Sequence, residues 1–346
     1  MPRLFCLVPP DAQGVAGEPN PLFIMNNTKR RSLVLALAVS FLGGPALAQD
    51  AWPSRPIRVV VPTAPGVAPD IFARVYAAEL GKIYKVPVTV DNKPGAAAIV
   101  AIDSVMKAPA DGYTVLYGFN APFTMNPHLY SKLPYDAERD LVPVTQTLKG
   151  AYFIVTGPNS PLRSIKDLIE SARAAPEKVS YASYGVGSAA HLALSLIEEK
   201  SGVRALHVPY KLSAIPDVIS GVVSVSTEPN GSAIPLIQSG QVRALAYLGS
   251  QRHPLLPNVQ TVAETLPGYE VLGWHGIWVR AGTPKTALDR LYGDLARITK
   301  SPEMVKRMTD VGFEPSAVNP AETAAIIRRE SAEWGALIRS RGIKAD

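Results

Sequence analysis

Residues 57–82 read IRVVVPTAPGVAPDIFARVYAAELGK, and their pattern sets the class of fold. The opening IRVVV is rich in β-branched residues and predicts a buried strand. Phe72, Tyr76 and Leu80 recur four residues apart, so they share one face of a helix. A loop of proline, glycine and alanine separates the strand from the helix. A strand, a loop and an amphipathic helix in this order predict an α/β protein built on mostly parallel sheets.

The same unit recurs along the chain. Ser164, with Asp167 three residues later, has the pattern of a helix N-cap. Pro284, Pro302 and Pro320 predict three helix starts, because proline suits the first helical turn. No repeat with a period of about 20 to 50 residues is present, which excludes a solenoid. Further strands are predicted at residues 86–90, 113–119, 153–155, 179–182, 205–208, 222–227 and 242–247, and a last strand from Trp274.

The predicted strands fall into two series, which implies two lobes. We place the crossovers between the lobes near Gly150 and Gly273, and we expect the C-terminal helices to return to the first lobe. Lobe 1 is then residues 49–150 and 274–346, and lobe 2 is residues 151–273. Two strands that join the lobes would act as a hinge.

Residues 26–49, NNTKRRSLVLALAVSFLGGPALAQ, have the three parts of an export signal. A basic cluster begins at Lys29, an apolar run follows, and Ala46-Leu47-Ala48 forms the predicted cleavage point. The apolar run is about ten residues long, half of what a membrane-spanning helix needs. We therefore predict a periplasmic protein cleaved after Ala48. Residues 1–48 would then comprise a segment translated from a start codon assigned too far upstream, followed by the export signal. Arg30-Arg31 leaves both the general secretory route and the twin-arginine route open.

Charge and composition exclude several functions. The chain has 35 Lys and Arg against 29 Asp and Glu, a net charge of +6 that is spread along the sequence. Because it has no basic run with interleaved aromatic residues, nucleic acid is not an expected partner. The only cysteine, Cys6, precedes the predicted cleavage point, so we expect no disulfide and no cysteine-held metal. His128, His207, His253 and His275 lack ligand spacing, so we expect no metal site and no cofactor.

Two loops carry the clearest signal for function. Residues 62–70 and 183–188 each connect the end of a strand to the start of a helix. Helix starts present unpaired N–H groups, and glycine-rich loops let these groups converge on a carboxylate or phosphate. In an open α/β sheet, ligands bind at the carboxyl ends of strands, where both loops lie. We predict that the two loops face each other and bind one anion; the alternative is that both are ordinary connections.

A serine hydrolase is the alternative from another class of function. Ser188 and His191 are three residues apart and would share a helix face, with Ser188 as nucleophile and His191 as its base. The surrounding sequence GVGSAAH is not the Gly-x-Ser-x-Gly elbow, and no acid is placed to orient the histidine. A capping serine followed by a structural histidine is the interpretation that we favour.

Short ordered motifs run through the chain after the predicted signal. They are WPSRPI at 52–57, VVVP at 59–62, NKPGA at 92–96, PADGYT at 109–114, LPYD at 133–136, GVGS at 185–188, HVPYK at 207–211 and AGTP at 281–284. In this order they resemble the Bug family of periplasmic solute receptors, which serve tripartite tricarboxylate transporters. The resemblance implies a two-lobed, type II periplasmic-binding-protein fold of the Venus-flytrap kind. It also implies a receptor that captures a small carboxylated solute between the lobes and is not an enzyme.

Transferred to the matching positions, the resemblance implies that main-chain amides of both lobes hold the solute's carboxylate. Glu228 stands where the family commonly has an aspartate, which meets the ligand's amine in receptors for amino acids. The implied partners are a small organic acid and either membrane transporter subunits or a sensor kinase, and we expect a monomer. The predicted ligand-binding residues are Thr63, Gly66, Val67, Asp70, Asn120, Ser183, Gly185, Gly187, Ser188 and Glu228.

Departures from the family pattern fall in and near the first of the two loops. Val67 replaces a glycine, and a β-branched residue does not easily adopt the positive φ that glycine allows. Pro69 replaces threonine or serine and has no N–H to donate. Ala97 and Ala98 replace two glycines. Because these changes remove donors and room, we predict a preference for a bulkier, more apolar carboxylate, such as an aromatic acid, over citrate or a dicarboxylic amino acid.

Overall fold

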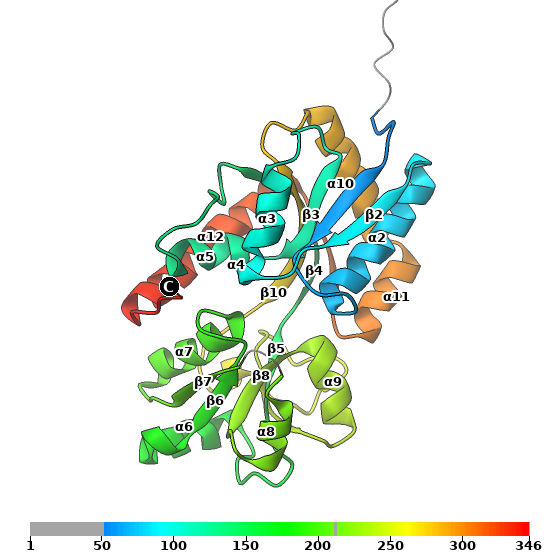
Figure 1. The fold of residues 1–346 in the computed structure, drawn as a ribbon. Helices are drawn as coiled ribbons and strands as arrows, with labels where there is room; N and C mark the ends of the chain where they lie inside the picture. Colours follow the sequence, from blue (N-terminus) through cyan, green and yellow to red (C-terminus); the bar gives the residue numbers. More distant parts are fainter. Residues whose placement is uncertain (1–51, 211–212, 346) are drawn as a thin grey trace, which may run out of the picture. The chain divides into compact units, whose positions relative to one another are not determined.

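A computed structural model describes residues 52–210 and 213–345, and Figure 1 shows how their helices and strands are arranged. The predicted export signal and its cleavage point lie outside the described residues. Within the described part, no helix is both long enough and apolar enough to cross a membrane. The chain forms two β-sheets with helices packed on them, so the predicted α/β class is confirmed.

The first sheet has six strands in the order β11-β4-β10-β3-β1-β2. β1 runs parallel to both of its neighbours, whereas β10 is antiparallel to β3 and β4, and β11 is antiparallel to β4. The prediction of mostly parallel sheets is therefore wrong. β10 returns into the sheet from the edge at which β4 leaves it, so it runs against its neighbours. The strands are β1 (Ile57–Val61), β2 (Val88–Asn92), β3 (Thr114–Phe119), β4 (Leu141–Gly150), β10 (Gly273–Arg280) and β11 (Glu314–Val318).

The second sheet has five strands in the order β7-β6-β8-β5-β9. β6 runs parallel to β7 and β8, and β5 is antiparallel to β8 and β9. This sheet is therefore mixed as well. Its strands are β5 (Tyr152–Thr156), β6 (Ser180–Ser183), β7 (Leu206–Pro209), β8 (Val225–Pro229) and β9 (Arg243–Tyr247).

The helix starts follow the sequence signals. Ser164 caps α6, and its side chain accepts the Asp167 N–H (3.2 Å), as predicted. Pro302 and Pro320 stand in the first turns of α11 and α12, and Pro284 directly precedes α10. The helices are α2 (Ala68–Tyr84), α3 (Ile99–Met106), α4 (Ala121–Thr124), α5 (Asn126–Leu129), α6 (Ile165–Ala174), α7 (Ala189–Ser201), α8 (Ile215–Ser220), α9 (Asn230–Gln238), α10 (Lys285–Thr299), α11 (Pro302–Asp310) and α12 (Pro320–Ser340), with short 3₁₀ turns at Ala96–Ala98, Pro176–Lys178 and Val262–Glu264.

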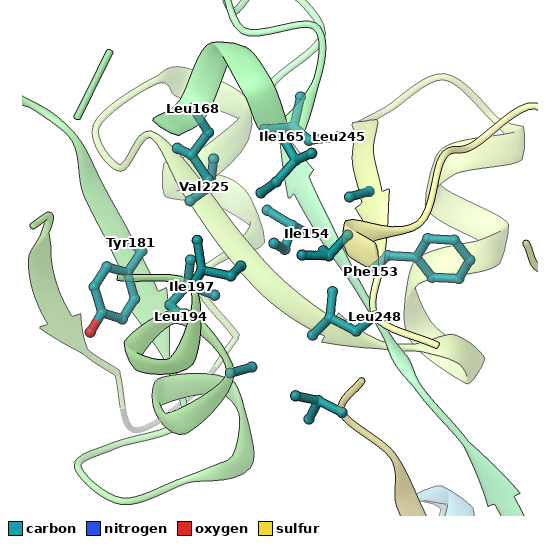
Figure 2. Packing of buried hydrophobic residues seen from close by; sticks show 14 of the residues in the cluster. Phe153, Ile154, Ile165, Leu168, Tyr181, Leu194, Ile197, Val225, Leu245 and Leu248 are labelled. Carbon is teal, nitrogen blue, oxygen red and sulfur yellow. The ribbon is translucent and has the colours of Figure 1, made fainter. Parts of the chain in front are cut away.

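Separate apolar clusters stabilise the two sheets. In the cluster of the second sheet, Ile154 of β5, Ile165 of α6 and Ile197 of α7 point toward one another (Figure 2). Phe153 points to the opposite face of the sheet, as alternation along a strand requires. The same cluster includes Trp334, so the C-terminal helix α12 also packs on helices of the second sheet.

A very short connection joins the two sheets. β4 ends at Gly150, in register with Gly273 at the start of β10. Ala151 alone separates Gly150 from Tyr152, which begins β5 and pairs with Pro229 at the end of β8. β4 runs in the same direction as β1 and β3, and β8 runs in the same direction as β6. The connection therefore joins the carboxyl edge of one sheet to the carboxyl edge of the other.

A left-handed turn follows β2. Ala96, Ala97 and Ala98 have φ angles of 45°, 49° and 74°. This region favours glycine, because the Cβ atom of any other residue crowds the backbone. The Asn126 side chain helps to hold the turn, since its Nδ2 donates to the Ala97 carbonyl (3.0 Å). We expect each alanine here to cost about 1 kcal/mol relative to glycine.

We predict that Ala97→Gly raises the free energy of unfolding by about 1 kcal/mol, because it relieves the left-handed strain. Ala97 is exposed, so loss of its methyl group removes little packing. Ala325→Gly, at an exposed site within α12, is the matched control and should lower the free energy of unfolding by about 1 kcal/mol. Urea unfolding followed by circular dichroism gives both values. A loss of stability in Ala97→Gly would show that the turn is not strained.

Candidate functional site

The predicted site residues gather at the two edges that the short connection joins. Residues 63–70 follow β1 and Asn120 follows β3, at the carboxyl edge of the first sheet. The 183–188 loop follows β6 and Glu228 lies in the end of β8, at the carboxyl edge of the second sheet. Within the described part of the chain, no hydrogen bond or ion pair links the 63–70 loop to the other three. The placement of that loop at the site is therefore inferred from topology.

Asp70 organises the loop after β1. Its side chain is 2% exposed and accepts hydrogen bonds from the Gly66 N–H (2.9 Å) and from Arg74 Nε (3.0 Å). Asn92 Nδ2 donates to Asp70 Oδ1 (2.9 Å) and to the Thr63 carbonyl (3.0 Å). Burial by itself raises the pKa of Asp70, but the hydrogen bonds that it accepts outweigh burial and hold the pKa below its usual value. Asp70 is therefore ionised at neutral pH and shapes the loop from inside.

Two details of this loop bear on the predicted site. The Gly66 N–H is used by Asp70, so it is not available to a solute. Val67 has φ −93° and ψ 164°, which is extended backbone that any residue adopts. Valine in place of glycine therefore introduces no backbone strain here. Pro69 lies in the first turn of α2, so Ala68 and Asp70 supply the free N–H groups of that turn.

The loop before α7 is likewise held from inside. Ser183 Oγ accepts the Gly185 N–H (3.1 Å), and the Gly187 N–H donates to His191 Nδ1 (3.0 Å). Gly187 has φ +77°, and a Cβ atom there would come within 2.6 Å of Leu129 Cδ1 of α5. Only glycine fits this position. The Gly185 and Gly187 amides that were expected to hold a solute are thus already paired.

Ser188 is the N-cap of α7, as the favoured interpretation predicted. Its Oγ accepts the His191 N–H (3.3 Å) and donates to the Gly185 carbonyl (2.8 Å). The ring nitrogen Nδ1 of His191 accepts from Gly187 and is not bonded to the Ser188 hydroxyl. The pair does not form a nucleophile and its base, so the hydrolase alternative has no support in this geometry.

The first turns of α2 and α7 keep unpaired N–H groups. Among residues 52–210 and 213–345, no acceptor is bonded to the N–H of Ala68, Asp70, Ala189 or Ala190. Of the predicted residues, Gly66, Gly185, Gly187 and Ser188 use their N–H groups inside the loops, whereas Asp70 keeps its N–H free of any acceptor among the described residues. Free N–H groups at a helix start, together with the helix dipole, attract a carboxylate.

Glu228 is 3% exposed and is held by two hydroxyl groups. The Tyr184 hydroxyl donates to Glu228 Oε2 (2.5 Å), and Ser226 Oγ donates to Oε1 (2.9 Å). Burial raises the pKa of Glu228, and these hydrogen bonds offset the rise only in part. Tyr184 was not predicted as a site residue. A tyrosine inside a loop of glycine and serine was the available signal.

A second carboxylate, Glu330 of α12, holds Asn120. Asn120 Nδ2 donates to Glu330 Oε2 (3.1 Å), and Trp274 Nε1 donates to Oε1 (2.9 Å). Burial raises the pKa of Glu330. Burial and the charge of Glu330 raise the pKa of Tyr152 to about 12. Tyr152 is therefore close enough to Glu330 to interact with its charge. Glu330 is 210 residues from Asn120 in the sequence, and no sequence pattern indicates the pair.

Described residues supply no group of three or more His, Cys, Asp or Glu side chains that would hold a metal ion. The site offers hydrogen-bond donors, the buried carboxylates Asp70 and Glu228, the partly buried carboxylate Glu330, and a helix start on each side.

Comparison with known proteins agrees with this architecture. Residues 72–343 match the model of the "tripartite tricarboxylate transporter family receptor" family. The chain is 35% identical to the UPF0065 protein in the tcbD-tcbE intergenic region of Pseudomonas sp. (strain P51), over 90% of this chain and 94% of that protein. The solved structure of R. palustris Rpa4515 with adipate has a TM-score of 0.78 and 31% identity, over 85% and 99% of the two chains. The periplasmic binding protein BugD has a TM-score of 0.74 and 31% identity, over 85% and 99%.

Fold and relatives together define the class: a two-lobed α/β solute-binding receptor. The expected type II periplasmic-binding-protein fold is confirmed. More particularly, the chain belongs to the receptor family of the tripartite tricarboxylate transporters, whose members are periplasmic receptors, and the resemblance to the Bug family is confirmed.

We predict that Asp70→Asn lowers the free energy of unfolding by about 2 kcal/mol at neutral pH, because it weakens charge-assisted hydrogen bonds inside the loop. Folding lowers the pKa of Asp70, so its contribution is complete above 3.8, the unfolded value, and is lost as the pH falls through the lower folded value. Asp103→Asn is the matched control, since Asp103 pairs with Lys107 on the exposed surface of α3. It should change stability by less than about 0.5 kcal/mol. Urea unfolding at several pH values checks both, and equal effects would refute the role of Asp70.

Proposed function

We propose that this receptor binds a small organic carboxylate between the first turns of α2 and α7 and delivers it to a membrane transporter. The solute's carboxylate accepts hydrogen bonds from the Ala68 and Asp70 amides on one side and from the Ala189 and Ala190 amides on the other. The observation that supports this best is the one-residue connection at Ala151, which joins the two carboxyl edges where these helices begin. The function needs neither a cofactor nor catalysis.

Capture follows from contact with both helix starts. A solute that binds both sides stabilises a closed arrangement, whereas a solute that binds one side shifts no equilibrium. We propose that the β4–β5 and β9–β10 connections serve as the hinge. The lobes in this proposal are residues 49–150 with 274–346, and residues 151–273.

The proposed solute carries an apolar body, as an aromatic acid does. Large apolar side chains are exposed at both helix starts: Val67 directly before α2, Ile71 in its first turn, and Tyr184 and Val186 before α7. Exposed apolar groups around a polar centre are typical of a ligand site. An apolar ring or chain would cover them, while a small hydrophilic acid would leave them in water.

Two carboxylates, one buried and one partly buried, support the same preference. Glu228 and Glu330 lie at the two joined edges and have no basic partner in an ion pair among the described residues. Each would repel a further negative charge on a solute. Citrate, which carries three carboxylates, is therefore a poor match for this site. The R. palustris relative was solved with adipate, which supports a carboxylate as the class of solute.

The proposal also covers the location of the protein, its oligomeric state and the recipient of the solute. The chain is exported, is cleaved after Ala48 and acts in the periplasm as a monomer. Transporter subunits in the membrane receive the solute, with a sensor kinase as the alternative recipient.

We predict that Ala189→Glu lowers the affinity for adipate or benzoate at least tenfold, or about 1.4 kcal/mol. The new carboxylate competes for the α7 amides and repels the solute. The helix itself should not lose stability, because a negative charge at a helix start is favourable. Ala325→Glu, at an exposed site of α12, is the matched control and should bind as the parent does. Isothermal titration calorimetry measures the affinity of both variants. An unchanged affinity in Ala189→Glu would show that the solute does not bind at the start of α7.

We predict that benzoate-like acids bind more tightly than citrate or aspartate, because only the former cover the exposed apolar side chains without adding charge near the buried carboxylates. A thermal-shift screen of organic acids, followed by calorimetry of each positive acid, measures the order. Citrate or aspartate binding with a near-micromolar dissociation constant, with no binding of benzoate-like acids, would contradict this preference and leave the general receptor function intact.

A further inference from the structure

A stacked pair of histidines lies next to the 183–188 loop. The rings of His191 (α7) and His207 (β7) have centroids 3.9 Å apart and planes inclined by only 3°. Tyr181 of β6 stacks on His207 with centroids 5.0 Å apart. Solute binding, as proposed above, involves neither ring directly.

Each histidine holds one end of the loop. The Gly187 N–H donates to His191 Nδ1 (3.0 Å), directly before the cap of α7. At the other end, Ser183 Oγ is hydrogen-bonded to His207 Nε2 (2.6 Å) and accepts the Gly185 N–H (3.1 Å). The two rings therefore fix the segment that leads into the free amides of α7.

The Gly187 bond fixes the protonation state of His191. A backbone N–H can only donate, so Nδ1 must be an acceptor without a proton, and the proton of the neutral ring is on Nε2. A second proton on the ring, at Nδ1, would point at the Gly187 N–H. Two donors would then face each other and the hydrogen bond would break. His207 meets no such conflict, because a protonated Nε2 can donate to Ser183 Oγ, which then donates to the Gly185 carbonyl (3.0 Å).

We propose that His191 is a positioning residue that holds the 183–188 loop in its binding shape only while its ring is neutral, so that acidification loosens the loop and releases the solute. This rests on the proposed function, because it takes the α7 amides to be part of the solute site. His207 tunes the transition, since two rings stacked in contact do not both carry a positive charge at low cost.

The groups that face His191 favour its neutral form. Burial lowers its pKa to about 4, and the positive charges of His207 and Arg341 contribute. The start of α7 also opposes a positive charge. Glu198, further along α7, is engaged by Arg341, and Tyr181 is uncharged at neutral pH. The folded pKa lies below the unfolded value of 6.5, so the contribution to loop stability is complete above pH 6.5 and is lost as the pH falls through about 4.

Three variants separate this role from simple packing. His191→Asn keeps an acceptor near the position of Nδ1 without a titrating ring, so the loop should stay ordered and its acid transition should disappear. His191→Leu removes the acceptor and should loosen the loop at every pH. His207→Gln removes the neighbouring charge and keeps a donor for Ser183, so the transition should move to higher pH by roughly half a unit or more.

Nuclear magnetic resonance of the ¹⁵N-labelled protein measures these effects without any solute. The Gly187 amide and the His191 ring nitrogens are followed from about pH 7.5 to about pH 3.5. His253→Asn is the matched control, because His253 Nδ1 also accepts a backbone N–H, from Leu255 (3.2 Å), outside the loop. It should leave the transition unchanged. A proton on Nδ1 of His191 at neutral pH, or no upward shift in His207→Gln, overturns the proposal.

Isothermal titration calorimetry with adipate and with benzoate, at neutral pH and near pH 4, tests whether the 183–188 loop controls the affinity for the solute. The parent should lose at least tenfold in affinity at the lower pH, and His191→Asn should lose much less. If neither acid binds at neutral pH, the proposed function fails, while the resonance data still decide the role of His191. If an acid binds equally at both pH values although the Gly187 bond breaks, the loop does not control release and this proposal is overturned.

Discussion

The chain crosses between its two sheets through one residue, Ala151, and the placement of the site depends on this tight crossing. Two glycines make room for aromatic side chains there. A Cβ atom at Gly150 would come within 2.8 Å of Phe313 Cδ1, and one at Gly273 within 2.7 Å of the Tyr152 hydroxyl. Because the crossing joins carboxyl edges, the residues that follow β1, β3, β6 and β8 lie at the two edges that it connects, although the sheets have separate apolar clusters.

Side chains within or beside each loop hold its backbone by hydrogen bonds. Asp70 does so after β1, and Ser183 and His191 do so before α7. A loop that is held from inside does not have to be ordered by its ligand, which lowers the entropic cost of binding. The amides of Gly66, Gly185 and Gly187 are thereby used, and those that we assign to the solute lie in the first turns of the helices.

The negative charges at the site impose a second constraint. Glu228 and Glu330 accept hydrogen bonds from neutral donors, among them Tyr184 and Asn120, rather than from basic side chains. Hydrogen bonds of this kind tolerate a buried carboxylate without cancelling its charge. Negative charge thus stays close to the predicted site, and in the proposed function it limits how many charges a solute can carry.

The sequence by itself determined the α/β class, the two loops, the capping role of Ser188 and the family. The first three follow from local patterns, which depend on residues only a few positions apart, and the family follows from the order of short motifs along the chain. It did not predict β4, β11, α4, α5, α8 or α9, each of which contains a proline that locally reads as a break, such as Pro143 in β4 and Pro235 in α9. The tertiary structure decided which amides stay free, that Val67 is extended, and that Glu330 meets Asn120. Those outcomes depend on hydrogen bonds and strand pairings between residues far apart in the chain, and local propensity carries no information about such partners.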